Sequence, residues 1–223
     1  MENEYGCEQV VPIEREPRHR RVLANEYVRV FLVEIAPHER TLCHHHAHDY
    51  VMYVIGDAEI VSAPRDSTPK TYNYRAGDCE FSPAGLVHVV ENRRDAKFSN
   101  LLVELLPGLR ELQRGDDPRS MDGNATVQAV LKEGRISVWS LETEAGARAE
   151  VHFPAIFVTL NPDSVRDISW VPSGGGLVGC DEYGRPLRSI LFQLGRAEVQ
   201  PAAVRKRIDE PLKTLRTQTE GPE

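Results

Sequence analysis

Residues 44–57, HHHAHDYVMYVIGD, and residues 77–92, GDCEFSPAGLVHVVEN, are the stretches that decide the fold. Most of positions 44–48 are histidine, namely His44, His45, His46 and His48. Residues two apart on a β-strand project from the same face, so His44 and His46 can aim their imidazoles at one point. Neutral imidazole nitrogen suits Fe, Ni, Cu and Zn. Because two imidazoles do not hold a metal ion on their own, we expect a third ligand from elsewhere in the fold.

The second stretch is the best source of that third ligand. Gly77 permits a tight turn, and Pro83 and Gly85 build a second turn. His88 then begins the strand that follows. We therefore expect His88 to complete the metal site.

Together the two stretches resemble the two sequence motifs of the cupin superfamily. The second stretch carries the glycine, proline, glycine, histidine and asparagine of one motif at Gly77, Pro83, Gly85, His88 and Asn92. The first stretch resembles the other motif, in which two histidines one residue apart precede a glutamate and a glycine. The resemblance implies a β-barrel of jelly-roll type with a divalent metal near its mouth. It also implies that the metal ligands are His44, His46 and His88.

One position departs from the pattern of the family. The glutamate ligand falls four residues after the second histidine, where this chain has Tyr50. The neighbouring Asp49 points to the opposite face of a regular strand. The resemblance therefore implies a site of three neutral histidines. Such a site leaves a divalent ion its full charge and open positions, which suit an anionic substrate together with O₂ or water.

Tyr50 is the candidate catalytic residue of this site. Its phenol can donate a hydrogen bond at the metal or act as a general acid. The alternative is that Tyr50 fills the barrel and bonds a neighbouring group.

His48 also has two interpretations. It shares the strand face of His44 and His46, so it can hydrogen-bond a ligand and orient it. The alternative is a shifted ligand set of His46, His48 and His88. The remaining members of the cluster, His38 and His45, are expected at the surface.

The rest of the chain is typical of an all-β protein. Its 15 prolines and 16 glycines divide it into short segments. The segments of strand length that are rich in Val, Ile, Leu, Phe and Tyr are 27–35, 50–55, 58–62, 71–74, 86–90 and 98–106. Many short strands separated by turns predict a sandwich or a barrel.

The strand pattern begins again in the second half. VRVFLVE at residues 28–34 aligns with ISVWSLE at residues 136–142, an offset of 108 residues. Further on, FSPAG from Phe81 resembles WVPSG from Trp170. We interpret this self-similarity as a duplicated β-domain.

The second copy lacks the histidines that the first copy has. His152 aligns with His44, so we expect it at the equivalent place in a second barrel. Pro154 stands where His46 would be, and the stretch from Ser173 contains no histidine to match that of the second motif. The second barrel is therefore expected to be vestigial, without metal, and to pack against the first as in bicupins.

These patterns predict an all-β fold of two tandem jelly-roll barrels. The expected segments are an N-terminal arm (1–21), a barrel with the metal site (22–107), a linker (108–125), a degenerate second barrel (126–200) and a C-terminal tail or short helix (201–223).

Composition excludes several classes of partner. The chain has 223 residues, with 27 Lys and Arg against 34 Asp and Glu and a net charge of −7, which argues against nucleic acid. No apolar run approaches the roughly 20 residues that span a membrane, and the N-terminus does not resemble a signal peptide. We therefore expect a cytoplasmic protein. Free thiols are expected at all four cysteines, Cys7, Cys43, Cys79 and Cys180.

These features favour a metal-dependent cupin dioxygenase. Fe(II) is the expected cofactor, with Zn, Ni, Mn and Cu as alternatives. The expected substrate is a small organic molecule, acidic or diketone-like, and the chain is expected to pair as a homodimer. The alternatives are a non-catalytic protein that binds a metal or a small molecule, and a cupin isomerase or lyase.

Overall fold

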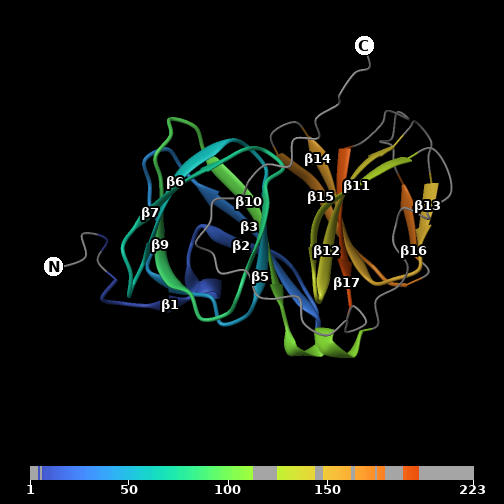
Figure 1. The fold of residues 1–223 in the computed structure, drawn as a ribbon, viewed down its shortest axis with the longest axis horizontal. Coiled ribbons are helices and arrows are strands. Elements are labelled where there is room, and N and C mark those ends of the chain that lie inside the picture. Colours follow the sequence, from blue (N-terminus) through green and yellow to red (C-terminus); the bar gives the residue numbers. More distant parts are fainter. Residues whose placement is uncertain are drawn as a thin grey trace, which may run out of the picture.

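The described part of the chain is built almost entirely from β-strands (Figure 1). The computed structural model describes residues 5, 7–112, 125–143, 148–161, 164–173, 175–178 and 188–195. Within this part, two short 3₁₀ helices cover Ile13–Arg15 and Pro107–Glu111. No helix in these ranges is long and apolar enough to cross a membrane. The expected tail or helix at 201–223, and residues 113–124 of the expected linker, lie outside the described residues.

Two five-stranded sheets form the first barrel, on the left of Figure 1. One sheet has the order β2 (His19–Ala24), β3 (Val28–Ile35), β10 (Phe98–Leu105), β5 (Tyr50–Val54) and β8 (Cys79–Ser82). The other has the order β1 (Val11–Pro12), β4 (His44–His45), β9 (Val87–Asn92), β6 (Ala58–Pro64) and β7 (Lys70–Tyr74). All neighbours run antiparallel except β1 and β4. This is the predicted jelly-roll barrel.

Glycines form the two turns that flank β8. Gly77 has a φ of 96° just before the strand, and Gly85 has a φ of 101° after it. Residues other than glycine rarely adopt such positive φ values, so the motif needs glycine at both positions. The turns return the chain to β9, where His88 lies directly opposite His44 on β4.

A third five-stranded sheet, in the C-terminal half, repeats the arrangement of the sheet that contains β2, β3, β10, β5 and β8. Its strands are β11 (Ala125–Glu133), β12 (Ile136–Thr143), β17 (Arg188–Leu194), β14 (Ala155–Asn161) and β15 (Ser164–Val171). The strand predicted at residues 136–142 is therefore confirmed. Phe81 pairs with Val51 in the first sheet, and Trp170 pairs with Ile156 in the third. The two aromatic residues thus hold equivalent positions, and the tandem arrangement is confirmed.

The structure overturns the expected place of His152. Strand β13 (Arg148–Val151), which pairs with β16 (Gly175–Val178), ends one residue before it. Val151 and Phe153 are buried in the interior of the second barrel, whereas His152 is exposed. The chain is shifted by one residue relative to the alignment with His44, and a one-residue shift turns a side chain to the other face. The prediction was wrong at this residue.

An apolar cluster fills the interior of the second barrel. Its largest members are Trp139, Phe153 and Phe157. Opposite its five-stranded sheet, the described part of this half contains a sheet of two strands, β13 and β16. The corresponding sheet of the first barrel, which contains β4 and β9, has five strands. The loss of a metal site from this half stays a prediction.

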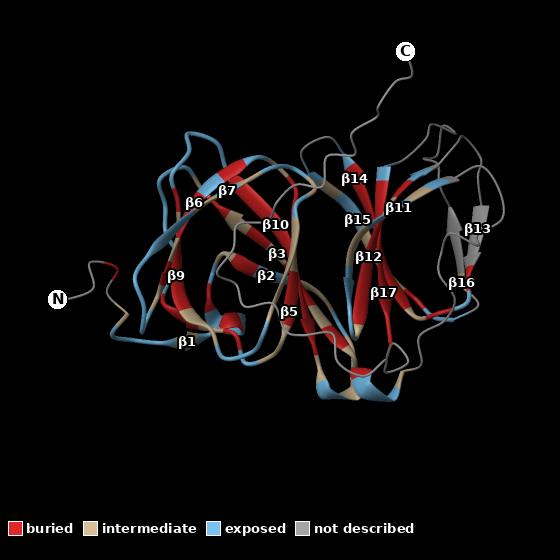
Figure 2. Cartoon of the chain, in the orientation of Figure 1, coloured by how far each residue is buried: buried red, intermediate tan, exposed pale blue. Residues whose placement is uncertain are grey.

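A shared hydrophobic core joins the two halves. Val51 and Val103 of the first barrel belong to the same buried cluster as Val138 and Phe192 of the second. All eight residues of β10 are buried, because one face of this strand lines the first barrel and the other faces the second half. Figure 2 shows the facing strands β10 and β12 as largely buried. The sheets therefore depend on each other for the burial of apolar surface.

The N-terminal arm is connected to the first barrel by a disulfide bond. Cys7 and Cys43 are bonded, with their Cα atoms 5.1 Å apart. The expectation of free thiols was wrong for these two, because the parallel pairing of β1 with β4 brings the arm beside Cys43. Cys79 is free, as expected, and Cys180 lies outside the described residues.

A truncation near residue 118 is expected to cause aggregation of the remaining first barrel. It removes the partner of the apolar face formed by Val51, Leu101 and Val103, and exposed apolar faces associate. Size-exclusion chromatography with light scattering compares the fragment with the full chain. A soluble, monomeric fragment would show that the first barrel is an independent domain.

Candidate metal centre

Four buried histidines gather inside the first barrel. They are His19 on β2, His44 on β4, His46 just after β4 and His88 on β9. The ring of His44 lies 4.7 Å from the rings of both His19 and His88, and 4.9 Å from that of His46, measured between centroids. The Nε2 atoms of His46 and His88 are 3.2 Å apart. The structure therefore brings together all three predicted ligands and adds His19.

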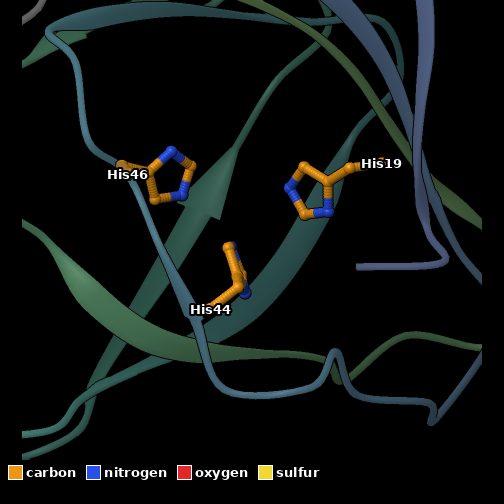
Figure 3. Close-up of side chains that lie close together, drawn as sticks. All are labelled: His19, His44 and His46. Carbon is orange, nitrogen blue, oxygen red and sulfur yellow. The ribbon is translucent and has the colours of Figure 1, made fainter. Parts of the chain in front are cut away.

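His19 reaches the cluster from the opposite sheet. Figure 3 shows its ring facing that of His46, with the ring of His44 between and below them. One ligand atom from each of these three residues can be chosen so that all lie within 4.8 Å of one another. That spacing allows three nitrogens to bind one ion after small rotations of the side chains.

Hydrogen bonds orient two of the imidazoles from behind. The Nδ1 of His44 donates to the carbonyl oxygen of Leu42 at 2.9 Å, and the Nδ1 of His88 lies 2.8 Å from the hydroxyl of Ser62. The Nε2 of His44 is buried and has no hydrogen-bond partner among the described residues. A histidine bonded at one nitrogen presents the lone pair of the other, which is the usual state of a metal ligand.

A buried carboxylate orients the third imidazole. The Nδ1 of His19 donates to Glu16 at 2.7 Å. The same carboxylate accepts the backbone N–H groups of Arg18 and Leu42. Burial alone would raise the pKa of Glu16, but the bonds from His19 and from the backbone lower it to about 2. Glu16 is therefore ionised, and a carboxylate behind a ligating histidine strengthens the ligand.

Burial keeps the imidazoles of His44, His46 and His88 uncharged. It lowers the pKa of His44 to about 4, and His19 adds a smaller effect in the same direction. The pKa values of His46 and His88 lie well below the usual range for the same main cause. Metal ligation requires neutral imidazole, so these residues are in the correct protonation state at neutral pH. The donor set of nitrogens fits a divalent transition metal.

Tyr50 contacts the cluster directly. Its ring stacks on that of His46, with 4.3 Å between centroids and 24° between planes. Burial raises the pKa of the Tyr50 phenol to about 12, so the hydroxyl keeps its proton at neutral pH. Tyr50 and the four histidines line a cavity of about 100 Å³ in the barrel. The catalytic role of Tyr50 stays a prediction.

The acidic neighbour of Tyr50 points away from the cavity. Asp49 accepts the backbone N–H of Ala84 at 2.8 Å and forms an ion pair with Arg135 of the second half. The described lining of the cavity does not include Asp49. This orientation of Asp49 agrees with the alternation expected from the sequence. The absence of a carboxylate ligand stays a prediction.

The structure does not bring His48 into the cluster. This residue is half-buried and does not line the cavity, as far as its described walls show. His38 is exposed and bonds Asp95 at 2.8 Å, and His45 is half-buried. The neighbour of the three predicted ligands is His19, which the sequence analysis missed. The only signal for His19 is its position three residues after Glu16, in a strand without regular alternation.

Comparison with known proteins gives similarity in structure alone. No protein-family model matches the sequence, and no curated protein matches it. AerE from Microcystis aeruginosa is 15% identical, with a TM-score of 0.53 over 80% of this chain and 98% of that one. Oxalate decarboxylase from Bacillus subtilis is 13% identical, with a TM-score of 0.51 over 77% of this chain and 70% of that one. A cupin domain from Bordetella pertussis is 25% identical and covers 37% of this chain and 85% of its own, with a TM-score of 0.36.

Substitutions in the cluster are expected to separate ligands from neighbours. His46→Ala and His88→Ala should each lower metal affinity far more than His48→Ala does, because each removes one imidazole of the cluster. Glu16→Gln should lower metal affinity by about 10–100-fold, since it releases the imidazole of His19. Titration against a chromophoric chelator measures the affinities, and His48→Ala is the matched control. Equal affinities of His19→Ala and His48→Ala would exclude His19 as a ligand, and full occupancy in His88→Ala would exclude the site.

Metal-free protein is expected to lose stability as the pH falls below about 6.5. His44 protonates near 6.5 in the unfolded chain but only near 4 in the fold, so the unfolded state binds more protons in this interval. The free energy of unfolding should fall by about 3 kcal/mol for this residue between those values.

Urea titrations of chelator-treated protein at a series of pH values measure this effect. His44→Gln should reduce the fall, whereas His45→Gln, at the half-buried neighbour, should keep it in full. The same pH dependence in the wild type and in His44→Gln would contradict the assignment.

Proposed function

We propose that this chain, which has the cupin fold with two barrels in tandem, is a metal-dependent oxygenase that acts on a small organic molecule. The observation that carries the proposal is the set of four buried imidazoles inside one barrel, of which those of His44, His46 and His88 are kept uncharged by burial. No carboxylate lies among the predicted ligands, since Tyr50 holds the position of the family's glutamate. Neutral ligands leave a divalent ion its charge and leave positions open for a substrate and O₂.

The metal that we propose is Fe(II). When bound, a redox-active ion of this kind supplies the one-electron chemistry that O₂ requires. Zn, Ni, Mn and Cu are the alternatives for a nitrogen donor set. The structurally similar oxalate decarboxylase has Mn(II) centres, which makes manganese the first alternative to test.

The side chains around the cluster have separate roles in this proposal. Glu16 holds His19 in one orientation, and the Leu42 carbonyl does the same for His44. Tyr50 keeps its proton and offers it as a hydrogen bond to a substrate oxygen beside His46. Strands of both sheets line the cavity and leave it partly open to solvent.

A binding protein without turnover is the second candidate. The small volume of the cavity, about 100 Å³, favours it, because a tight cavity can hold one small ligand without space for a second reactant. A cupin isomerase or lyase is the third, since one fold supports many reactions. The homodimer, the cytoplasmic location and the absence of nucleic-acid partners stay predictions.

Oxygen consumption tests the proposed reaction. Protein loaded with Fe(II) is expected to take up O₂ with at least one member of a panel of small acids, diketones and hydroxyketones. Tyr50→Phe should lower the rate by about 10²–10⁴-fold at unchanged metal content, because it removes one proton donor. Elemental analysis of each sample provides the control. Full metal content without O₂ uptake across the panel would favour the binding protein.

A further inference from the structure

The cavity that contains the histidines has a second polar region on other strands. Its members are Tyr72 and Tyr74 on β7, Glu80 and Ser82 on β8, and Asn100 on β10. Strand β2, which carries His19, and strand β8, which carries Glu80, are the two edges of one sheet. The cavity therefore has an imidazole wall and a separate wall of phenols and a carboxylate.

The second wall is negatively charged or neutral throughout. Tyr74 donates its hydroxyl to Glu80 at 2.7 Å, and the rings of Tyr72 and Tyr74 are parallel and 5.8 Å apart. Burial, with a smaller contribution from Glu80, raises the pKa of both phenols, so both keep their protons. None of the described residues that line the cavity is a lysine or an arginine. This wall therefore has no positive charge to balance a negative group of a ligand beside Glu80.

Asn100 supplies an acceptor that the protein leaves unused. The residue is 3% exposed, and its side-chain oxygen receives no hydrogen bond from the described residues. Its partners across the ladder are Val33 and Val54, which have apolar side chains. A buried acceptor of this kind is costly unless a ligand donates to it. Asn100 therefore favours a ligand with an O–H or N–H group.

Apolar side chains occupy the space between the two walls. Met52 and Leu102 face each other across β5 and β10, and Ile60 of the other sheet lines the same cavity. The volume of about 100 Å³ is smaller than the cavity of about 150 Å³ that holds benzene in another protein. The enclosed part of the ligand is therefore small, of no more than about six non-hydrogen atoms.

We propose that this cavity selects an uncharged small molecule that carries a hydroxyl group remote from its metal-binding oxygen. The hydroxyl donates to Asn100 or Glu80, and a short apolar segment crosses the cavity to the histidines. That one end of the ligand binds the metal depends on the proposed function. That its other end carries a hydroxyl group depends only on the residues of the second wall. This narrows the expectation from the sequence, because a substrate with a carboxylate at its far end would meet Glu80 without a cation.

Binding of matched ketones tests the proposal without turnover. The probes are 4-hydroxybutan-2-one, which has the remote hydroxyl, acetoacetate, which has a carboxylate there, and butan-2-one, which has neither. Isothermal titration calorimetry under nitrogen measures their affinities for the full chain. We expect the hydroxyketone to bind at least about tenfold more tightly than acetoacetate, since the carboxylate of the probe and that of the half-buried Glu80 repel each other.

Two variants identify the groups responsible. Glu80→Gln should remove most of the discrimination against acetoacetate, because it deletes the negative charge. Asn100→Leu should lower the affinity for the hydroxyketone by about 3–10-fold, because one neutral hydrogen bond is lost. The affinity for butan-2-one should not change. Neither residue is among the four histidines, so the metal content of both variants should equal that of the wild type.

The outcomes separate this inference from the proposed function. Wild-type protein that binds acetoacetate as tightly as the hydroxyketone, or a preference that survives both substitutions, would overturn the inference even with metal bound. Protein that binds no metal but prefers the hydroxyketone would overturn the proposed function and would support the selection of a hydroxyl group by the second wall. The wild-type comparison alone decides the first point if a variant fails to fold.

Discussion

A single buried carboxylate, that of Glu16, connects the two sheets of the first barrel at the histidine cluster. It accepts a hydrogen bond from His19 on β2 and another from the backbone of Leu42, which precedes β4. A buried charge is tolerated only when such donors surround it, and the lowered pKa of Glu16 reflects them. The carboxylate thereby fixes His19 opposite His44, and the position of both rings defines the space in which an ion can bind.

The second half of the chain supports this site from a distance. The sheet that contains β12, β14 and β17 covers the outer face of β10. The inner face of β10 carries Asn100 and Leu102, which line the cavity. A strand that is buried on both faces has little freedom to shift its register, so the cavity walls keep their positions. The ion pair of Asp49 with Arg135 adds a polar link between the halves. The second half therefore covers the outer face of the strand that carries part of the cavity wall.

Local patterns predicted the fold well, and long-range contacts explain what they missed. The motif glycines and the pairing of His44 with His88 follow from turn and strand geometry, which act over a few residues. His19 could not be found in this way, because a single histidine at the start of an irregular strand carries no periodic signal. The same limit applies to the Cys7–Cys43 bond, which depends on the pairing of distant strands. At His152 the alignment failed because one residue of shift reverses the face of a strand.

The central claim is that imidazoles from both sheets surround one metal ion. X-ray absorption spectroscopy of the full chain loaded with Zn²⁺, which is redox-inert, tests this claim most directly. The account predicts scattering from four imidazole nitrogens at about 2.0–2.1 Å, with no sulfur ligand. Substitution of His19 should reduce the imidazole count by one. A zinc site with two or fewer imidazoles, or one with thiolate ligands, would contradict it.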